Sequence, residues 1–117
     1  MMQILNHHIY EFKKGVREMV LCTLSGSMEE KAKARLEKDG IAYMIQRQVN
    51  GNINVFFGKK DCLLVACNIC KNKPLNKLTP EEDFMLGMLL GYSLCEQCKR
   101  YSKRKEEKKA ILDKLII

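Results

Sequence analysis

The spacing of hydrophobic and polar positions divides the chain into strand-like and helix-like segments. Residues 17–25 are rich in apolar and β-branched side chains, which indicates a strand. In residues 41–49 one face collects apolar side chains, and only Arg47 interrupts it. That face consists of Ile41, Tyr43, Ile45 and Val49. We therefore expect a second strand here, with residues 52–57 as a third.

Asn50-Gly51 predicts how the second and third strands are joined. A two-residue type I′ turn needs positive φ at both central positions, and Asn-Gly is the sequence that best meets this need. With such a turn, Val49 pairs with Asn52 and Ile45 pairs with Phe56. Arg47 then lies opposite Asn54.

Helical spacing and capping signals predict the remaining elements. Ser27 and Glu30 form a capping box before a helix over residues 28–39, which Gly40 ends in the left-handed conformation. A second helix runs from residue 59 to 70, with its apolar side on Cys62, Ala66 and Ile69. Thr79, Pro80 and Glu82 mark the clearest helix start in the chain. Residues 6–14 fit either a short helix or an extended lead-in.

This order of elements predicts an α+β fold: a three-stranded sheet packed by about five helices, with a single domain over residues 1–117. The strand–helix–strand unit makes the first strand parallel to its neighbour if the two pair. The helices are expected against one face of the sheet. A sheet this small has exposed edges, and pairing with a second subunit would cover them.

The most apolar segment is FMLGMLLGYSLC, residues 84–95, within a helix that we expect to continue through Cys98 and to break, if at all, near Ser102. This segment has no polar face, so it is buried on most sides. Two interior glycines each cost about 1 kcal/mol relative to Ala unless another helix approaches closely. One interpretation is a homodimer that packs on Gly87, Leu90, Gly91 and Leu94. The other is a central helix that the chain's own elements surround.

Charge is concentrated in one segment. The chain of 117 residues carries a net charge of +7, and residues 99–117 contribute +5 of it. The residues that form the candidate basic patch are Lys99, Arg100, Lys103, Arg104 and Lys105. Such a patch can steer an acidic protein partner or bind nucleic acid phosphates. The last turns carry an apolar face that we expect to dock on the body or on a second subunit, formed by Ile111, Leu112, Leu115 and Ile116.

Two C-x-x-C pairs supply the candidate metal site, with possible ligands Cys67, Cys70, Cys95 and Cys98. Four thiolates in this pattern are typical of zinc, and an iron–sulfur cluster fits the same ligands. Neither pair is followed by glycine, because Lys71 and Lys99 come next. The alternatives are buried thiols that act as small hydrophobes and a thiol-based redox role. Cys22 and Cys62 are expected in the core.

The other chemical signals are weak. The neighbouring His7 and His8 could be ligands or acid–base groups, although partly exposed or satisfied side chains are the commoner case. The chain contains no dinucleotide, P-loop, zinc-protease or nucleophile-elbow motif. No secretory signal and no membrane-spanning length of apolar residues is visible, so a cytoplasmic protein with reduced thiols is expected.

The stretches Asn6–Leu24 and Leu78–Tyr101 resemble an uncharacterised family of small bacterial proteins, described only as a domain of unknown function. The resemblance implies three strands, about five helices and a homodimer, and it brings no activity and no site residues. It also suggests a connection with flavodoxins, which are acidic electron carriers.

The sequence therefore favours a homodimeric protein-interaction or regulatory module that acts by binding and not by catalysis, with a flavodoxin-like acidic protein as the candidate partner. The alternatives are a zinc- or iron-binding or thiol-based sensor and a nucleic-acid-binding protein.

Overall fold

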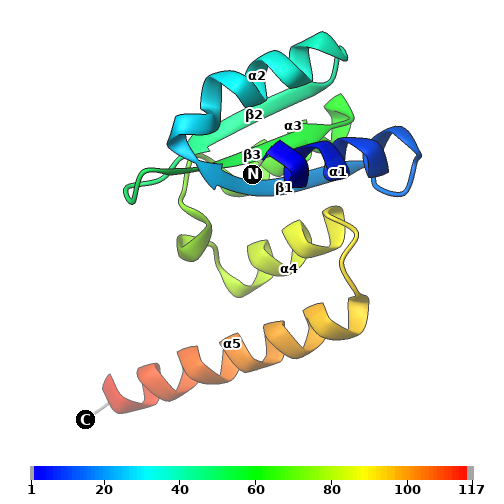
Figure 1. The fold of residues 1–117 in the computed structure, drawn as a ribbon. Helices are drawn as coiled ribbons and strands as arrows, with labels where there is room; N and C mark the ends of the chain where they lie inside the picture. The colour runs from blue at the N-terminus through cyan, green and yellow to red at the C-terminus, as the bar shows by residue number, and fades with distance from the viewer. Residues whose placement is uncertain (1, 116–117) are drawn as a thin grey trace.

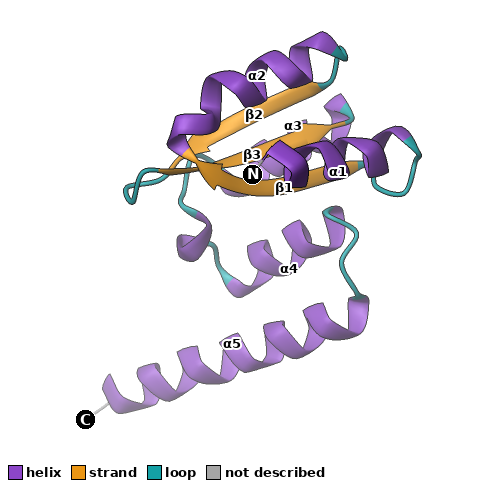
Figure 2. Cartoon of the chain, in the orientation of Figure 1, coloured by secondary structure: helices purple, strands orange, loops and turns teal. Residues whose placement is uncertain are grey.

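In the part of the chain that the structure describes, four helices pack on a three-stranded sheet, and a fifth helix packs on one of them (Figures 1 and 2). The computed structural model describes residues 2–115. The strands are β1 (Met19–Ser25), β2 (Ala42–Arg47) and β3 (Asn52–Gly58). The helices are α1 (Met2–Lys13), α2 (Glu29–Lys38), α3 (Lys60–Cys70), α4 (Pro80–Leu89) and α5 (Leu94–Leu115), and two short 3₁₀ turns are η1 (Gly26–Met28) and η2 (Leu75–Lys77). The predicted α+β fold is confirmed.

β3 lies between β1 and β2 and pairs antiparallel with both. The expectation of a parallel pair is therefore wrong. β1 and β2 do run in the same direction, but β3 separates them. The cause is the composition of β3, whose residues from Ile53 to Gly58 are all buried. A nearly continuous apolar run is covered on both faces only in the middle of the sheet.

Helices cover both faces of the sheet, which corrects the expectation of a single covered face. α1 and α2 pack on one face, where the buried core includes Leu5, Ile9, Ala32, Leu36, Val20, Val55 and Phe57. α3 and α4 pack on the other face, where the core includes Met19, Phe56, Leu63, Ala66, Cys70, Leu86 and Leu90. α5 lies beyond α4, on the side away from the sheet (Figure 1).

The hairpin register differs by one residue from the predicted one. Arg47 lies opposite Ile53, and Ile45 lies opposite Val55. The Gln48 amide donates to the Asn52 carbonyl at 2.9 Å, and the Gly51 amide donates to the Gln48 carbonyl at 3.2 Å. These bonds define a three-residue loop that ends in a glycine bulge, with Gly51 at φ +88°. Val49, which was expected in the strand, is therefore an exposed loop residue.

The helix ends show which capping signals were used. Gly40 has φ +67° after α2, as predicted. The predicted Ser27 cap is wrong, because Ser25 caps the η1 turn and α2 begins later, at Glu29. Of the two alternatives for residues 6–14, the helix is correct, because they lie largely within α1. In α3, Ala66 is buried as predicted, but Leu63 and Cys70 share its side, while Ile69 is only half-buried.

A row of polar side chains crosses all three strands near the hairpin. Asn54 on β3 is 2% exposed. Its Oδ1 accepts hydrogen bonds from Thr23 Oγ1 at 2.8 Å and from Gln48 Nε2 at 2.7 Å. Its Nδ2 donates to Gln46 Oε1 at 3.0 Å. Gln46 Nε2 in turn donates to the Lys73 carbonyl at 2.6 Å. Because the buried amide has partners for both of its ends, it stabilises this end of the sheet instead of costing free energy.

Gly58→Ala tests the close approach of strand and loop at the end of β3. A Cβ on Gly58 would lie 2.4 Å from the Glu18 carbonyl oxygen, and Gly58 has φ +143°. Gly15 also has positive φ, +78°, but open space around it. We expect Gly15→Ala to lower the free energy of unfolding by about 1–2 kcal/mol and Gly58→Ala to cost about 1–3 kcal/mol more. Urea unfolding measures both, and equal costs would contradict the backbone clash.

Candidate functional site

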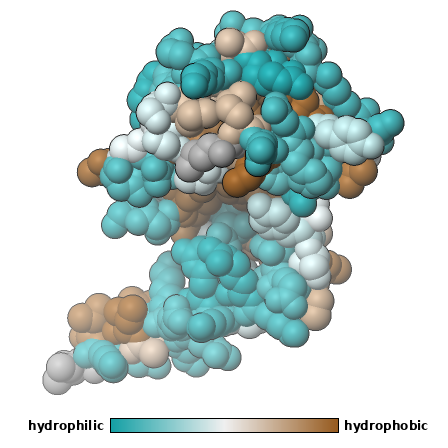
Figure 3. All heavy atoms as spheres, in the orientation of Figure 1, coloured by the Kyte–Doolittle hydropathy of each residue, from teal (hydrophilic) through white to brown (hydrophobic). Residues whose placement is uncertain are grey.

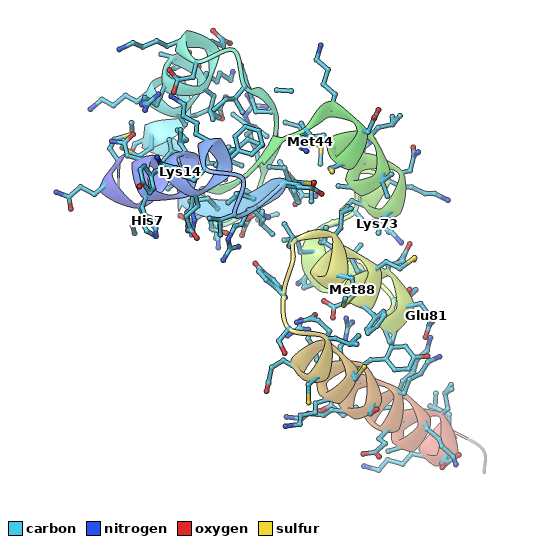
Figure 4. The ribbon with its side chains drawn as sticks, turned by 90° about the vertical axis from the view of Figure 1, so that its right-hand side faces the viewer. His7, Lys14, Met44, Lys73, Glu81 and Met88 are labelled. Atoms are coloured by element: carbon cyan, nitrogen blue, oxygen red, sulfur yellow. The ribbon has the colours of Figure 1, made fainter. Side chains whose placement is uncertain are left out.

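The start of α4 is fixed by a capping box and a cation. Thr79 Oγ1 accepts from the Glu82 amide at 3.1 Å, and Glu82 Oε1 accepts from the Thr79 amide at 2.8 Å, as predicted. Lys73, in the connection from α3 above α4 (Figure 4), donates to the same carboxylate at 2.6 Å. The hydrogen bonds from Lys73 and from the Thr79 backbone lower the pKa of Glu82 to about 2. This end of α4 is therefore firmly attached to the α3 connection.

The end of α4 divides the apolar segment into two helices. The Gly91 amide donates to the Met88 carbonyl at 3.0 Å, and the Tyr92 amide donates to the Gly87 carbonyl at 3.1 Å. With Gly91 at φ +78°, these bonds form a Schellman motif. The prediction of one helix through Cys98 is wrong, because the break falls at residues 91–93 and not near Ser102. A long C-terminal helix does exist, but it starts at Leu94 and is mostly polar.

α5 folds back along α4 through one close approach and one aromatic pair. A Cβ on Gly87 would lie 2.1 Å from Oε1 of Gln97, so the glycine gives α5 room to approach. Phe84 and Tyr101 meet edge to face with ring centroids 5.9 Å apart. Gln97, Tyr101 and Arg104 are the half-buried residues of α5. The contact is thus narrow and mostly polar.

Ion pairs complete the contact between α4 and α5. Asp83 accepts from Arg100 at 2.7 and 3.1 Å in a two-point pair. Arg104 lies 3.5 Å from the same carboxylate and donates to the Leu78 carbonyl at 2.8 Å. Lys105 lies 2.8 Å from Glu81. The hydrogen bond from Lys105 is the main cause of the lowered pKa of Glu81.

These contacts change the meaning of the candidate basic patch. Arg100, Arg104 and Lys105 are engaged with acidic side chains of α4 in their own chain. Lys99 lies 3.9 Å from Glu96. Among the described residues, Lys103 is the only member of the patch without an ion pair. The acidic first turn of α4, which suits the helix dipole, also neutralises part of the basic segment.

Three of the four residues predicted for a homodimer interface have roles within one chain. Leu90 is 3% exposed and belongs to the core beside α3, and Gly87 receives Gln97. Gly91 ends α4, while Leu94 is 57% exposed at the start of α5. The glycines therefore no longer require a second subunit as their explanation. The homodimer itself stays a prediction.

The far end of α5 has no cover. Residues 106–115 are all exposed, and no side-chain hydrogen bond, ion pair or ring contact joins them to the rest of residues 2–115. Ile111, Leu112 and Leu115 are 61%, 50% and 73% exposed. Figure 3 shows them as an apolar cluster at the tip of the molecule. The expectation that this face docks on the chain's own body is wrong, and Ile116 lies outside the described residues.

The structure does not gather the four candidate metal ligands. Cys70 is buried at the end of α3, and burial raises the pKa of its thiol. Cys67 is exposed on the same helix, and Cys95 and Cys98 are exposed on α5. Within residues 2–115, no three His, Cys, Asp or Glu side chains form a group that could hold a metal ion. One chain alone therefore offers two separate thiol pairs. Of the two expected core cysteines, Cys22 is buried and Cys62 is partly buried against the core.

His7 and His8 lie on α1, near the carboxylate of Glu11 and the guanidinium group of Arg17. Glu11 lies 3.2 Å from His7 Nε2 and 3.7 Å from His8 Nδ1. Burial, with a smaller contribution from Arg17, lowers the pKa of His8. The Nδ1 atom of His8 is buried without a hydrogen bond. Burial and Arg17 therefore favour the neutral form of His8, against the opposing effect of Glu11.

Comparison with known proteins places the chain in a family. Residues 3–104 match the family model described as "Protein of unknown function (DUF2023)". The match covers most of the chain, so this small α+β protein belongs to that family, and the predicted resemblance is confirmed at this level. No curated protein matches it. Among the described residues, none of the helices has the length and apolar character needed to cross a membrane.

Removal of the Lys73 cation tests the attachment of α4. Because the pKa of Glu82 is lowered to about 2 in the folded chain, its stabilising effect is complete above the unfolded pKa near ~4.3. The effect is lost as the pH falls from there through about 2. We expect Lys73→Met to raise the Glu82 pKa in an NMR titration. Lys13→Met should instead raise the pKa of Asp39, which is also about 2, and should leave Glu82 unchanged. An unchanged Glu82 pKa in Lys73→Met would contradict the contact.

Gly87 tests the approach of α5. Because a Cβ there would overlap the end of the Gln97 side chain, Gly87→Ala should lower the free energy of unfolding only slightly, and Gly87→Leu by about 1–3 kcal/mol. Gln97→Ala added to Gly87→Leu should recover part of that loss. Thermal unfolding of the wild type, Gly87→Leu, Gln97→Ala and the double variant gives the coupling between the two positions. If the two effects on stability are additive, Gly87 and Gln97 are not in contact, and the described approach of α5 to α4 is wrong.

Proposed function

We propose that the chain is a protein-interaction module that acts by binding, and that the free end of α5 is the surface that meets its partner. The observation that supports this most directly is a helix of 22 residues with no buried residue. A solvated helix end without a role would normally carry polar residues on all sides, whereas this one ends in exposed isoleucine and leucine.

The apolar end continues the face that holds α5 on α4. Gln97, Tyr101 and Arg104 face α4, and the same alternating spacing of four and three residues leads to Lys108, Ile111 and Leu115. α4 begins at Pro80 and is too short to accompany the face to its end. Residues 106–115 therefore extend about 15 Å past the contact at 1.5 Å per residue. An amphipathic helix in this position is suited to a groove on another protein.

The net charge of the chain favours a partner with an apolar groove and an acidic rim. Within residues 106–115 themselves, three lysines are balanced by Glu106, Glu107 and Asp113. The whole chain, however, is positively charged, at +7. Opposite charge on the partner would speed association, and the apolar contact would supply most of the affinity. A flavodoxin, as an acidic electron carrier, is the candidate partner that the family resemblance suggests. Self-association through this same face would give a homodimer, although with an interface other than the predicted one on Gly87, Leu90, Gly91 and Leu94.

The decisive variant is Ile111→Ser with Leu115→Ser. Burial of one leucine-sized side chain contributes about 1.5–3 kcal/mol, so loss of two should weaken binding to a purified flavodoxin by at least about tenfold. Isothermal titration at low and at high salt measures this. The free energy of unfolding should change by no more than about 0.5 kcal/mol, because both side chains are exposed.

Leu64→Ser is the matched control, because Leu64 is 61% exposed on α3, as Ile111 is on α5. It should bind as the wild type does. Light scattering on the same samples shows whether the partner is a second copy, since the double variant would then be a monomer. A wild-type chain that stays monomeric and binds no acidic protein, or a double variant that binds normally, would remove the proposal.

A further inference from the structure

The outer edge of β2 presents unpaired main-chain groups. Gln48 and Asn52 form a hydrogen-bonded pair, and such pairs alternate along an antiparallel ladder. The main-chain groups of Tyr43, Ile45 and Arg47 therefore point away from β3. β2 has no second neighbouring strand in the sheet. Within residues 2–115, these three residues make no other main-chain hydrogen bond.

This edge is accessible along its length. Tyr43 and Ile45 are half-buried and Arg47 is exposed. The side chains of Tyr43 and Arg47 are tied to α2 through Glu37 and Glu29, which holds β2 against that helix. On β1, the other edge strand, Met19 is 0% exposed among the residues that point away from β3, whereas Leu21 and Ser25 are half-buried and Thr23 is exposed. Of the usual protections against pairing, the edge of β2 has the charged side chain of Arg47 but no proline and no bulge.

A pocket of about 250 Å³ lies beside the same edge, between β2 and the end of α3. It is lined by Met44, Gln46, Phe56, Cys67, Cys70 and Asn72, among others. Met44 points from β2 toward α3 (Figure 4). The Gln46 amide already has partners at both ends, Asn54 and the Lys73 carbonyl. The walls combine apolar carbon and sulfur with the polar side chains of Gln46, Arg47 and Asn72, in a volume below the roughly 300–1,000 Å³ of typical small-molecule sites.

We propose that the β2 edge and this pocket together bind an extended peptide segment of a partner protein as a fourth strand. The free NH and CO groups of β2 repeat at every second residue. Only another extended backbone has donors and acceptors at the same spacing and can hydrogen-bond to all of them. Side chains of an added strand alternate between the two faces of the sheet. Side chains of the added strand that lie beside Met44 and Gln46 are on the α3 face of the sheet, where they fill the pocket. The ligand is therefore an extended strand with one bulky, mainly apolar side chain at that position.

This surface is independent of the proposed function of α5, since no residue of α5 lines the pocket. The test uses dodecapeptides selected by phage display on the whole protein. Bound peptides should protect the amides of Tyr43, Ile45 and Arg47 from hydrogen exchange measured by NMR. Cys67→Trp fills the pocket and should weaken peptide binding by at least about tenfold. Cys95→Trp, at another exposed cysteine, should bind as the wild type does.

A second measurement does not depend on the folding of any variant. N-methyl groups on the alternate peptide amides that face β2 should abolish binding, while N-methyl groups on the other amides should leave it unchanged. Ile111→Ser with Leu115→Ser should bind the peptides normally, which separates this surface from that of α5. The proposal is overturned if no peptide is selected, if the peptides protect α5 instead, or if both methylated forms bind equally.

Discussion

Placement of β3 between β1 and β2 is the constraint on which the rest of the structure depends. A strand that is buried on both faces needs helices on both sides of the sheet. α1 and α2 cover one face, and α3 and α4 cover the other. The outer strands β1 and β2 then become the two edges. The exposed edge of β2, beside the end of α3, is a direct result of this order.

The second layer of helices determines where α5 can lie. α4 uses Leu86 and Leu90 against the core, and the adjacent strip of its surface is left to hold α5. That strip offers Asp83 and the small Gly87 instead of a broad apolar surface. α5 is consequently held by charge and shape over its first half. Its apolar end is left without cover, and we propose that a binding partner covers it.

Local signals in the sequence predicted the elements better than their arrangement. Thr79 and Glu82 act within one turn, so their capping box could be recognised directly. Asn50-Gly51 predicted a hairpin but not its three-residue loop, because the loop length depends on the register of β2 against β3, which the rest of the fold determines. The order of the strands depends on contacts distant in the sequence, and no local pattern contains them.

The candidate site was also only partly visible in the sequence. The basic residues of α5 could be found by their charge, but their pairing with Asp83 and Glu81 depends on the turn at Gly91. From the sequence alone, Gly91 could lie inside a helix or at its end. Only the hydrogen bonds of Gly91 and Tyr92 to the last turn of α4 show that the helix ends there. Spacing brought the two C-x-x-C pairs to attention, whereas the fold places them on separate helices.

The central claim is that the apolar end of α5 is open in the isolated chain. The most direct measurement is the relaxation of methyl groups by a soluble paramagnetic agent, in dilute samples labelled at Ile and Leu. The account predicts that Ile111, Leu112 and Leu115 relax as strongly as Leu64, which is exposed on α3. Relaxation as weak as that of Leu86, which is 5% exposed in the core, would contradict it.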